Sequence, residues 1–174
     1  MRLIFDSSSL ITCCRITVEG EPIIEAVLQV CDVIVPASVS REVTIAQHLY
    51  PDASVAARLI SLKRIQVHKV DLPPDNVLDH YKLGTGEKEA IALFLEAKDY
   101  SFLVTDDRLA YIVASRCAVP VCLFLALLVE LVNNGLMDVK KSRKIALATE
   151  VRYPKGFVPH TLRILERGER KWLV

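Results

Sequence analysis

Short runs of consecutive apolar residues alternate with segments of helical periodicity along this chain. Runs of this length, rich in β-branched residues, are typical of strands that a parallel sheet buries on both faces. They occupy residues 3–5, 33–36, 102–105 and 119–122. A further segment, 65–70, alternates apolar and polar residues like an exposed or edge strand, and Pro73-Pro74 would end it. The alternation predicts an α/β fold with a mostly parallel sheet.

Apolar residues recur at helical spacing between these runs. In the central segment, Ala90, Leu93, Phe94 and Ala97 share one predicted helical face. Asn133-Asn134-Gly135 marks the end of another helix. The predicted helices span 23–30, 37–46, 51–60, 87–97, 109–115, 123–132, 138–150 and 160–167, with one more after residue 6 that a serine would cap. The charged tail, 168–174, is expected to fray.

Acidic side chains follow two of the predicted buried strands. Asp6 comes directly after 3–5, and Asp106 and Asp107 come directly after 102–105. The crevice beyond the carboxyl ends of the strands is the usual ligand site of an open α/β sheet. A carboxylate there is costly to desolvate unless it meets a cation or hydrogen-bond donors. The position favours a functional Asp6 over an Asx turn, and it suggests that one of the other two aspartates caps a helix while the other coordinates a ligand.

Two glutamates begin the central helix, and a third lies in an earlier one. Glu87 and Glu89 are two residues apart, which is a rotation of roughly 200° about a helix axis, so they cannot both point into one site. One is therefore a candidate ligand, and the other is a first-turn charge that the helix dipole favours. Glu42 lies about one turn into the helix after 33–36. Taken alone it would be an ordinary exposed helix glutamate.

The length of 174 residues and a hydrophobic content of 52% predict one compact domain over 1–174. The net charge of +1 indicates no particular partner, but its distribution is uneven: residues 1–137 carry −5 and residues 138–174 carry +6. We expect 138–174 to be a basic helical C-terminal extension. It could attract polyanions, or it could simply be a solvated surface.

The cysteines and histidines indicate neither disulfides nor a zinc site. The five cysteines form no Cys-x-x-Cys pair, and the four histidines are scattered. No signal peptide opens the chain, and the longest apolar stretch, 119–132, contains Glu130 and is shorter than the ~20 residues of a membrane span. These features predict a cytoplasmic protein with reduced thiols and no membrane partner.

Four of these features, in this order, resemble the PIN-domain nucleases, which include the VapC-type toxins. They are Asp6 after the first strand, Glu42, Gly-x-Gly-Glu-x-Glu-Ala at 84–90 and Val-Thr-Asp-Asp at 104–107, and the likeness spans roughly residues 1–125. The resemblance implies a three-layer α/β/α fold with C-terminal helices. It also implies an acidic quartet that binds Mg²⁺ or Mn²⁺ and hydrolyses single-stranded RNA. Carried over by motif, the quartet is Asp6, Glu42, Glu89 and Asp107, supported by Ser7 and Thr105.

The third acidic position departs from the family pattern, because it is usually an aspartate and here is a glutamate. Glu89, 18 residues before Asp107, suits the family's helix-to-strand spacing, whereas Glu87 would pair better with Asp106. Both pairs therefore remain candidate metal ligands beside Asp6 and Glu42. A hard cation such as Mg²⁺ fits an all-carboxylate ligand set.

The resemblance also implies partners. An acidic pocket needs basic residues at its rim to hold RNA, and the candidates are Arg41, Arg108, Lys140, Lys141, Arg143 and Lys144. The VapC likeness implies an antitoxin protein and a homodimer, for which the apolar helix 123–132 offers an interface, although core burial would explain that helix equally well. Two alternatives come from other classes. One is a non-catalytic PIN-like scaffold that binds RNA or protein. The other is a haloacid-dehalogenase-like phosphatase, which ranks last because Ser8 stands where its second aspartate is required.

Overall fold

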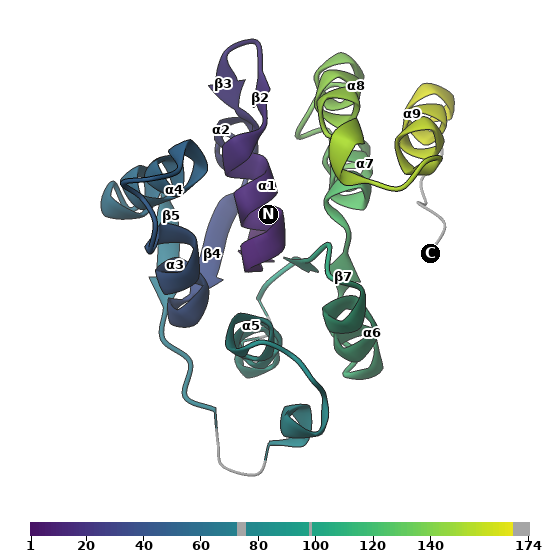
Figure 1. Cartoon of the computed structure of the whole chain (residues 1–174). Coiled ribbons are helices and arrows are strands. Elements are labelled where there is room, and N and C mark those ends of the chain that lie inside the picture. Colours follow the sequence, from purple (N-terminus) through teal and green to yellow (C-terminus); the bar gives the residue numbers. More distant parts are fainter. Residues whose placement is uncertain (73–75, 98, 169–174) are drawn as a thin grey trace.

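A five-stranded parallel sheet forms the centre of the computed structural model, which describes residues 1–72, 76–97 and 99–168 (Figure 1). The strand order is β5-β4-β1-β6-β7. The strands are β1 (Arg2–Phe5), β4 (Asp32–Pro36), β5 (Ile65–His68), β6 (Phe102–Val104) and β7 (Val121–Cys122). All four strand pairings are parallel. The predicted strands are thus confirmed, including the edge position of β5, although β7 is shorter than expected.

A small antiparallel hairpin, β2 (Thr17–Val18) and β3 (Glu21–Pro22), was not predicted. Glu19 and Gly20 at its tip both have left-handed backbones, with φ of 55° and 87°. Two successive left-handed residues make the tight turn that joins two antiparallel strands. Strands of two residues are too short to show a period in the sequence.

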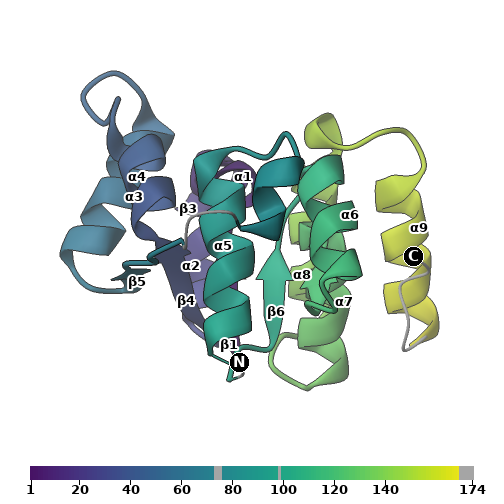
Figure 2. The same ribbon diagram turned by 90° about the horizontal axis from the view of Figure 1, so that it is seen from below.

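Helices cover both faces of the sheet, which confirms the three-layer α/β/α architecture. In β1, Leu3 and Phe5 point into one apolar core, whereas Ile4 points into the other. The first core is covered mainly by α1 (Ser7–Arg15), α2 (Ile23–Leu28), α3 (Ala37–Thr44), α4 (Pro51–Ser61) and α7 (Phe124–Asn133). The second is covered by α5 (Thr85–Glu96) and α6 (Arg108–Arg116), which lie in front of the sheet in Figure 2.

The C-terminal extension forms α8 (Val139–Ala148), the 3₁₀ turn η2 (Glu150–Arg152) and α9 (Phe157–Arg167). Helix α9 begins three residues earlier than predicted, directly after Gly156, whose φ of 99° favours glycine. Ile164 and Leu165 of α9 pack against Val129 of α7. Because the chain covers α7 itself, no second copy is needed to bury this helix, and the homodimer stays a prediction.

Local boundaries also differ at α1. Asp6, not a serine, caps this helix, because the Asp6 carboxylate accepts a hydrogen bond from the Ser9 backbone. A short 3₁₀ turn, η1 (Val77–His80), precedes α5. Pro73-Pro74 and most of the tail expected to fray, 169–174, lie outside the described residues. Among the residues that are described, no helix is long and apolar enough to cross a membrane.

The order of the strands fixes where the sheet can bind a ligand. From β1 the chain proceeds outward to β4 and β5, then returns to place β6 on the other side of β1. The carboxyl ends of β1 and β6 therefore flank the point where the connections diverge, which is the usual ligand crevice of such sheets. Phe5 pairs with Val104 in the parallel register, so the next residues, Asp6 and Thr105, lie side by side.

Candidate acidic active site

Asp6 is the most constrained carboxylate at this crevice. It is only 2% exposed. Its oxygens accept hydrogen bonds from the Thr105 hydroxyl (2.5 Å), the Ser8 hydroxyl (2.9 and 3.0 Å) and the Ser9 backbone N–H (2.8 Å). Burial nevertheless raises the pKa of Asp6 to about 6, because loss of hydration outweighs the stabilisation from these donors. A cation would offset that cost.

Thr105 connects Asp6 with Asp107. The buried Thr105 hydroxyl donates to Asp6 and accepts a hydrogen bond from the Asp107 backbone N–H at 3.1 Å. Asp107 in turn caps α6, because its Oδ1 accepts from the Ala110 backbone at 2.8 Å. The threonine therefore fixes the relative positions of two carboxylates that follow different strands. These contacts are compatible with the supporting role that the family resemblance implies for Thr105, which stays a prediction.

Glu42 reaches the crevice from α3 and meets Ser7 of α1. The Ser7 hydroxyl donates to Glu42 Oε2 at 2.7 Å. Gly86 of α5 lies against the same pair: a Cβ built on Gly86 would be 3.6 Å from Glu42 Oε2, 3.5 Å from Ser7 Oγ and only 2.9 Å from a methyl group of Val39. The second glycine of the Gly-x-Gly motif is thus required by the close approach of α5 to α3.

Glu87 and Glu89 point in different directions, as their spacing requires. Glu87 is half-buried and lines the acidic cavity; its Oε2 also accepts from the Gly84 backbone N–H at 2.8 Å at the start of α5. Glu89 is buried and its Oε2 accepts from the Ser38 hydroxyl (2.5 Å) and backbone N–H (3.1 Å). Because Pro36 provides no side-chain cap for α3, Glu89 satisfies a free N–H in the first turn of that helix.

The acidic cavity has a volume of about 350 Å³ and brings Asp6, Glu42 and Glu87 together on its walls. Burial raises the pKa of Glu87, and the nearby charges of Asp107 and Glu42 raise it further. Asp107 therefore lies within electrostatic reach of the cavity although it does not line it. Glu89 is not on the cavity wall. The structure thus gathers four of the six candidate carboxylates.

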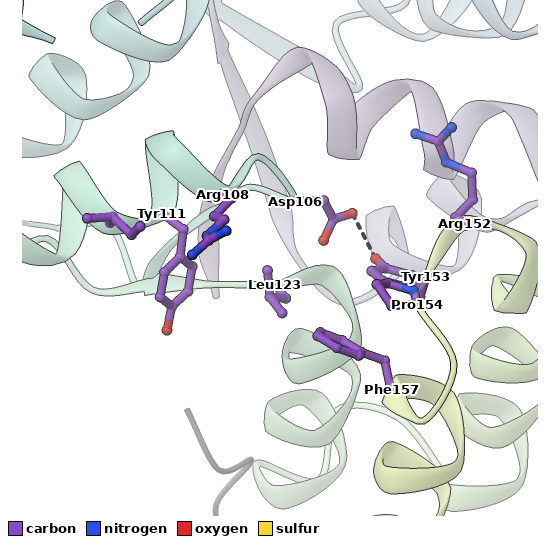
Figure 3. A pocket seen from close by; sticks show the side chains of 9 residues that line it. Asp106, Arg108, Tyr111, Leu123, Arg152, Tyr153, Pro154 and Phe157 are labelled. Atoms are coloured by element: carbon purple, nitrogen blue, oxygen red, sulfur yellow. Dashed lines mark hydrogen bonds between the residues drawn. The ribbon is translucent and has the colours of Figure 1, made fainter. Parts of the chain in front are cut away.

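Asp106 faces a different way from its neighbour Asp107. One oxygen accepts from the Phe124 backbone N–H at 3.1 Å, and the other accepts from the Tyr153 hydroxyl at 2.7 Å, as Figure 3 shows. Burial raises the pKa of Asp106, and these two donors oppose that rise. Asp106 consequently joins the end of β6 to the start of α7 and to the C-terminal extension.

The basic residues proposed for phosphate contact are widely separated. Arg41 is exposed, directly before Glu42, and Arg108 begins α6. The α8 cluster, by contrast, contacts other elements: Lys141 donates to Gln29 at 2.9 Å, Lys144 pairs with Glu19 at 2.5 Å and Arg143 pairs with Glu166. Lysines 140, 141 and 144 and Arg143 do not line the acidic cavity.

Arg152 is the basic residue on the cavity wall, and the sequence analysis missed it. It lies in η2, 45 residues after Asp107, in a segment where only the overall positive charge was informative. No motif surrounds it. Its proximity to Asp6 depends on how the C-terminal extension packs, which local pattern does not encode.

The donor chemistry of the cavity fits a hard divalent cation, because carboxylate oxygens converge where two of them have raised pKa values. In the described part of the chain, however, no group of three or more His, Cys, Asp or Glu side chains is arranged closely enough to hold an ion as it stands. Serines, a threonine and backbone N–H groups occupy the carboxylates instead.

Comparison with known protein families matches residues 2–167 to a family model described as a PIN domain. Among solved structures, the chain is similar to a PilT N-terminus domain protein from Sulfolobus solfataricus P2, with a TM-score of 0.47, 17% identity and coverage of 71% of this chain and 87% of that one. It is also similar to a domain of a functionally unknown protein from Methanocaldococcus jannaschii DSM 2661, with a TM-score of 0.45, 17% identity and coverage of 71% and 90%. A comparison with curated proteins gave no match.

The family match covers nearly the whole chain, so the protein belongs to the PIN-domain family. The family resemblance seen in the sequence is confirmed. PIN domains are generally nucleases and typically use divalent metal ions, and membership indicates a nuclease-type fold with a nucleic-acid ligand.

Proposed function

We propose that this protein is a Mg²⁺- or Mn²⁺-dependent ribonuclease that hydrolyses phosphodiester bonds of single-stranded RNA. The observation that carries the proposal is the meeting of Asp6, Glu42 and Glu87 on one cavity wall, at the carboxyl end of β1, in a member of the PIN-domain family. The resemblance to VapC-type toxins extends the proposal to a toxin role that an antitoxin protein would control.

Asp6, Glu87 and Asp107 are the principal ligands in this proposal, and Glu42 is a further ligand or the base that orients the attacking water. The assignment moves the third carboxylate from Glu89 to Glu87, because Glu87 lines the cavity while both bonds to Glu89 come from Ser38. When bound, the ion supplies a Lewis acid that lowers the pKa of water and neutralises charge on the phosphate.

The residues around the carboxylates hold them in place for this chemistry. Thr105 orients Asp6 by donating to one of its oxygens, and the Ser9 backbone donates to the other. Ser7 orients Glu42 by donating to its Oε2. Arg152, at the cavity wall, supplies positive charge where an RNA phosphate must approach four carboxylates.

The proposal is tested by Asp6→Asn. We expect this variant to lose Mn²⁺-dependent cleavage of single-stranded RNA and to lose the rise in melting temperature that Mn²⁺ gives the unchanged protein. Its fold should remain, because asparagine keeps the shape of the side chain and can still accept the Ser9 hydrogen bond. Circular dichroism and thermal melting without metal check the fold.

Asp32→Asn is the matched control. Asp32 is exposed at the amino end of β4. The acidic cavity lies at the carboxyl ends of the strands, so the replacement of Asp32 should leave cleavage and the Mn²⁺ response unchanged. Full cleavage activity in the Asp6→Asn variant would refute the ligand assignment.

A second candidate function is a PIN-like scaffold that binds RNA or protein without cutting. The observation that favours it is that four hydrogen bonds from within the chain already reach both oxygens of the Asp6 carboxylate. A scaffold of this kind would bind RNA, show no thermal shift with Mn²⁺ and release no RNA fragments. The same metal titration and nuclease assay therefore separate the two functions.

A further inference from the structure

A larger cavity, of about 490 Å³, lies beside the acidic one. Its walls are mostly apolar and come from three elements: Tyr111 of α6, Leu123 just before α7 and Phe157 at the start of α9 (Figure 3). Its size is within the roughly 300–1,000 Å³ of small-ligand sites. The C-terminal extension builds one side of it, so this cavity exists only because that extension packs across the end of the sheet.

The two cavities meet at Arg152, which lines both of them. Arg108 lines the apolar cavity as well. Among the described residues, neither arginine side chain makes a hydrogen bond or an ion pair. The charge of Arg152 does lower the pKa of Asp106, but its guanidinium N–H groups donate no hydrogen bond within the described residues. Such a guanidinium can bind a phosphate with two parallel hydrogen bonds or stack on a flat ring. Arg152 is thus placed to hold a phosphate between the two cavities.

The walls of the larger cavity are mostly apolar and aromatic, which favours a flat ring over a highly polar group. Three charged residues, Asp106, Arg108 and Arg152, complete the lining. Both Asp106 oxygens are already occupied, by Phe124 N–H and the Tyr153 hydroxyl, so this carboxylate does not need a donor from a ligand. Aromatic rings such as Tyr111 and Phe157 are the surfaces on which unpaired bases stack.

We propose that this apolar cavity is a base-binding subsite. An unpaired base next to the phosphate being cleaved stacks against Tyr111 and Phe157, and Arg152 binds the phosphate that joins the two cavities. The inference rests on the proposed nuclease function. It adds a site that holds the RNA on one side of the phosphodiester bond to be cleaved. It assigns the C-terminal extension a part in substrate binding.

The aromatic wall is in place before any ligand binds. Phe157 stacks with Tyr153, with ring centroids 6.4 Å apart and planes 12° from parallel. The Tyr153 hydroxyl is held by Asp106, and burial raises the Tyr153 pKa, so that hydroxyl stays protonated and continues to donate. A wall fixed in this way loses little side-chain freedom when a base enters.

The test measures RNA binding separately from cleavage. The Asp6→Asn protein, which is expected not to cut RNA, is titrated against a fluorescent single-stranded RNA of roughly ten nucleotides. An abasic strand of the same length and charge is titrated in parallel, with fluorescence anisotropy as the readout. Adding Tyr111→Leu should weaken binding of the RNA about 5- to 150-fold while leaving binding of the abasic strand unchanged. Adding Tyr111→Phe, which keeps the ring, should leave both unchanged.

Arg152→Ala tests the shared phosphate contact. It should weaken binding of both the RNA and the abasic strand. It should also reduce the steepness of log affinity against log salt by about 0.7, the value expected for one phosphate contact to a single strand. Arg116→Ala is the matched control, because Arg116 is exposed in the last turn of the same helix that carries Tyr111 and does not line either cavity.

Equal binding of the base-containing RNA by the Tyr111→Leu and Tyr111→Phe proteins would overturn the subsite. That result is also expected if the cavity instead takes an apolar side chain of a protein partner. Failure of the nuclease proposal looks different, because the unchanged protein would then release no RNA fragments with Mn²⁺ even where binding depends on the ring at position 111.

Discussion

The two cavities at the carboxyl end of the sheet place different charges beside their carboxylates. In the acidic cavity, Asp6, Glu42 and Glu87 share the walls, and the charges of Asp107 and Glu42 raise the pKa of Glu87 beyond the effect of burial. In the apolar cavity, Asp106 has a donor for each oxygen and joins two elements of the fold. Asp6 and Asp106 both follow strands at the carboxyl end of the sheet, so position alone does not separate function from structure. Burial raises the pKa of both, and Asp6 has more donors than Asp106. The neighbouring charges differ, because other carboxylates share the acidic cavity with Asp6, whereas the charge of Arg152 lowers the pKa of Asp106.

Glu87 and Glu89, two residues apart in α5, show a similar contrast, because Glu87 lines the acidic cavity and Glu89 bonds to Ser38. Replacing each of them predicts the largest difference in cleavage activity. Glu87→Gln should lower Mn²⁺-dependent cleavage by more than about 100-fold, because it removes a charged ligand from the cavity, and substitutions even one shell further from a metal cost roughly 10- to 100-fold. Glu89→Gln should keep activity within a few-fold, since a glutamine oxygen can still accept from Ser38. Steady-state cleavage rates measure both.

The two variants form a matched pair, with the same chemical change on the same helix. Thermal melting without metal should show Glu87→Gln folded. If Glu89→Gln proved inactive while Glu87→Gln cut RNA normally, Glu89 would be the ligand. The spacing of 18 residues to Asp107 would then be the correct criterion, and the position of Glu87 on the cavity wall would be the wrong one.

The sequence could predict which strand ends bear the candidate carboxylates. It could not predict which acid of each neighbouring pair faces the cavity. Asp6 and Asp107 follow apolar runs, and parallel strands end at one edge, so their proximity follows from pattern. The rotation of a helix also shows that Glu87 and Glu89 diverge. Which of them enters the cavity depends on where Ser38 lies, and that is a contact between α5 and α3 across 51 residues. Arg152 likewise reaches the site only through the packing of the C-terminal extension.

Gly86 allows the acidic cavity to close, and its replacement should have the next largest effect. In Gly86→Ala the new methyl group would lie 2.9 Å from a methyl of Val39, which is fully buried and has no room to move. We expect a loss of about 1–3 kcal/mol in the free energy of unfolding, typical of overpacking. Activity should also fall, because α5 must shift away from Ser7 and Glu42. Urea denaturation measures the stability.

Val39→Ala combined with Gly86→Ala provides the control for this clash. Removing the opposing methyl groups should make the double variant more active than Gly86→Ala alone, even though Val39→Ala by itself leaves a cavity in the core. Strictly additive losses of stability and activity in the double variant would contradict a direct contact between these two positions.

Tyr153→Phe, on the apolar side, should have the smallest effect. It removes one of the two donors to Asp106 and keeps the ring that stacks with Phe157. The loss in unfolding free energy should be about 1–2 kcal/mol, as for a part-buried hydrogen bond to a carboxylate. Urea denaturation measures this loss. Cleavage in the acidic cavity should change little, because Asp106 is not assigned as a ligand there. If Tyr153→Phe instead lost Mn²⁺-dependent activity with its fold intact, the result would show that the two cavities act together in catalysis and that Asp106 is a ligand.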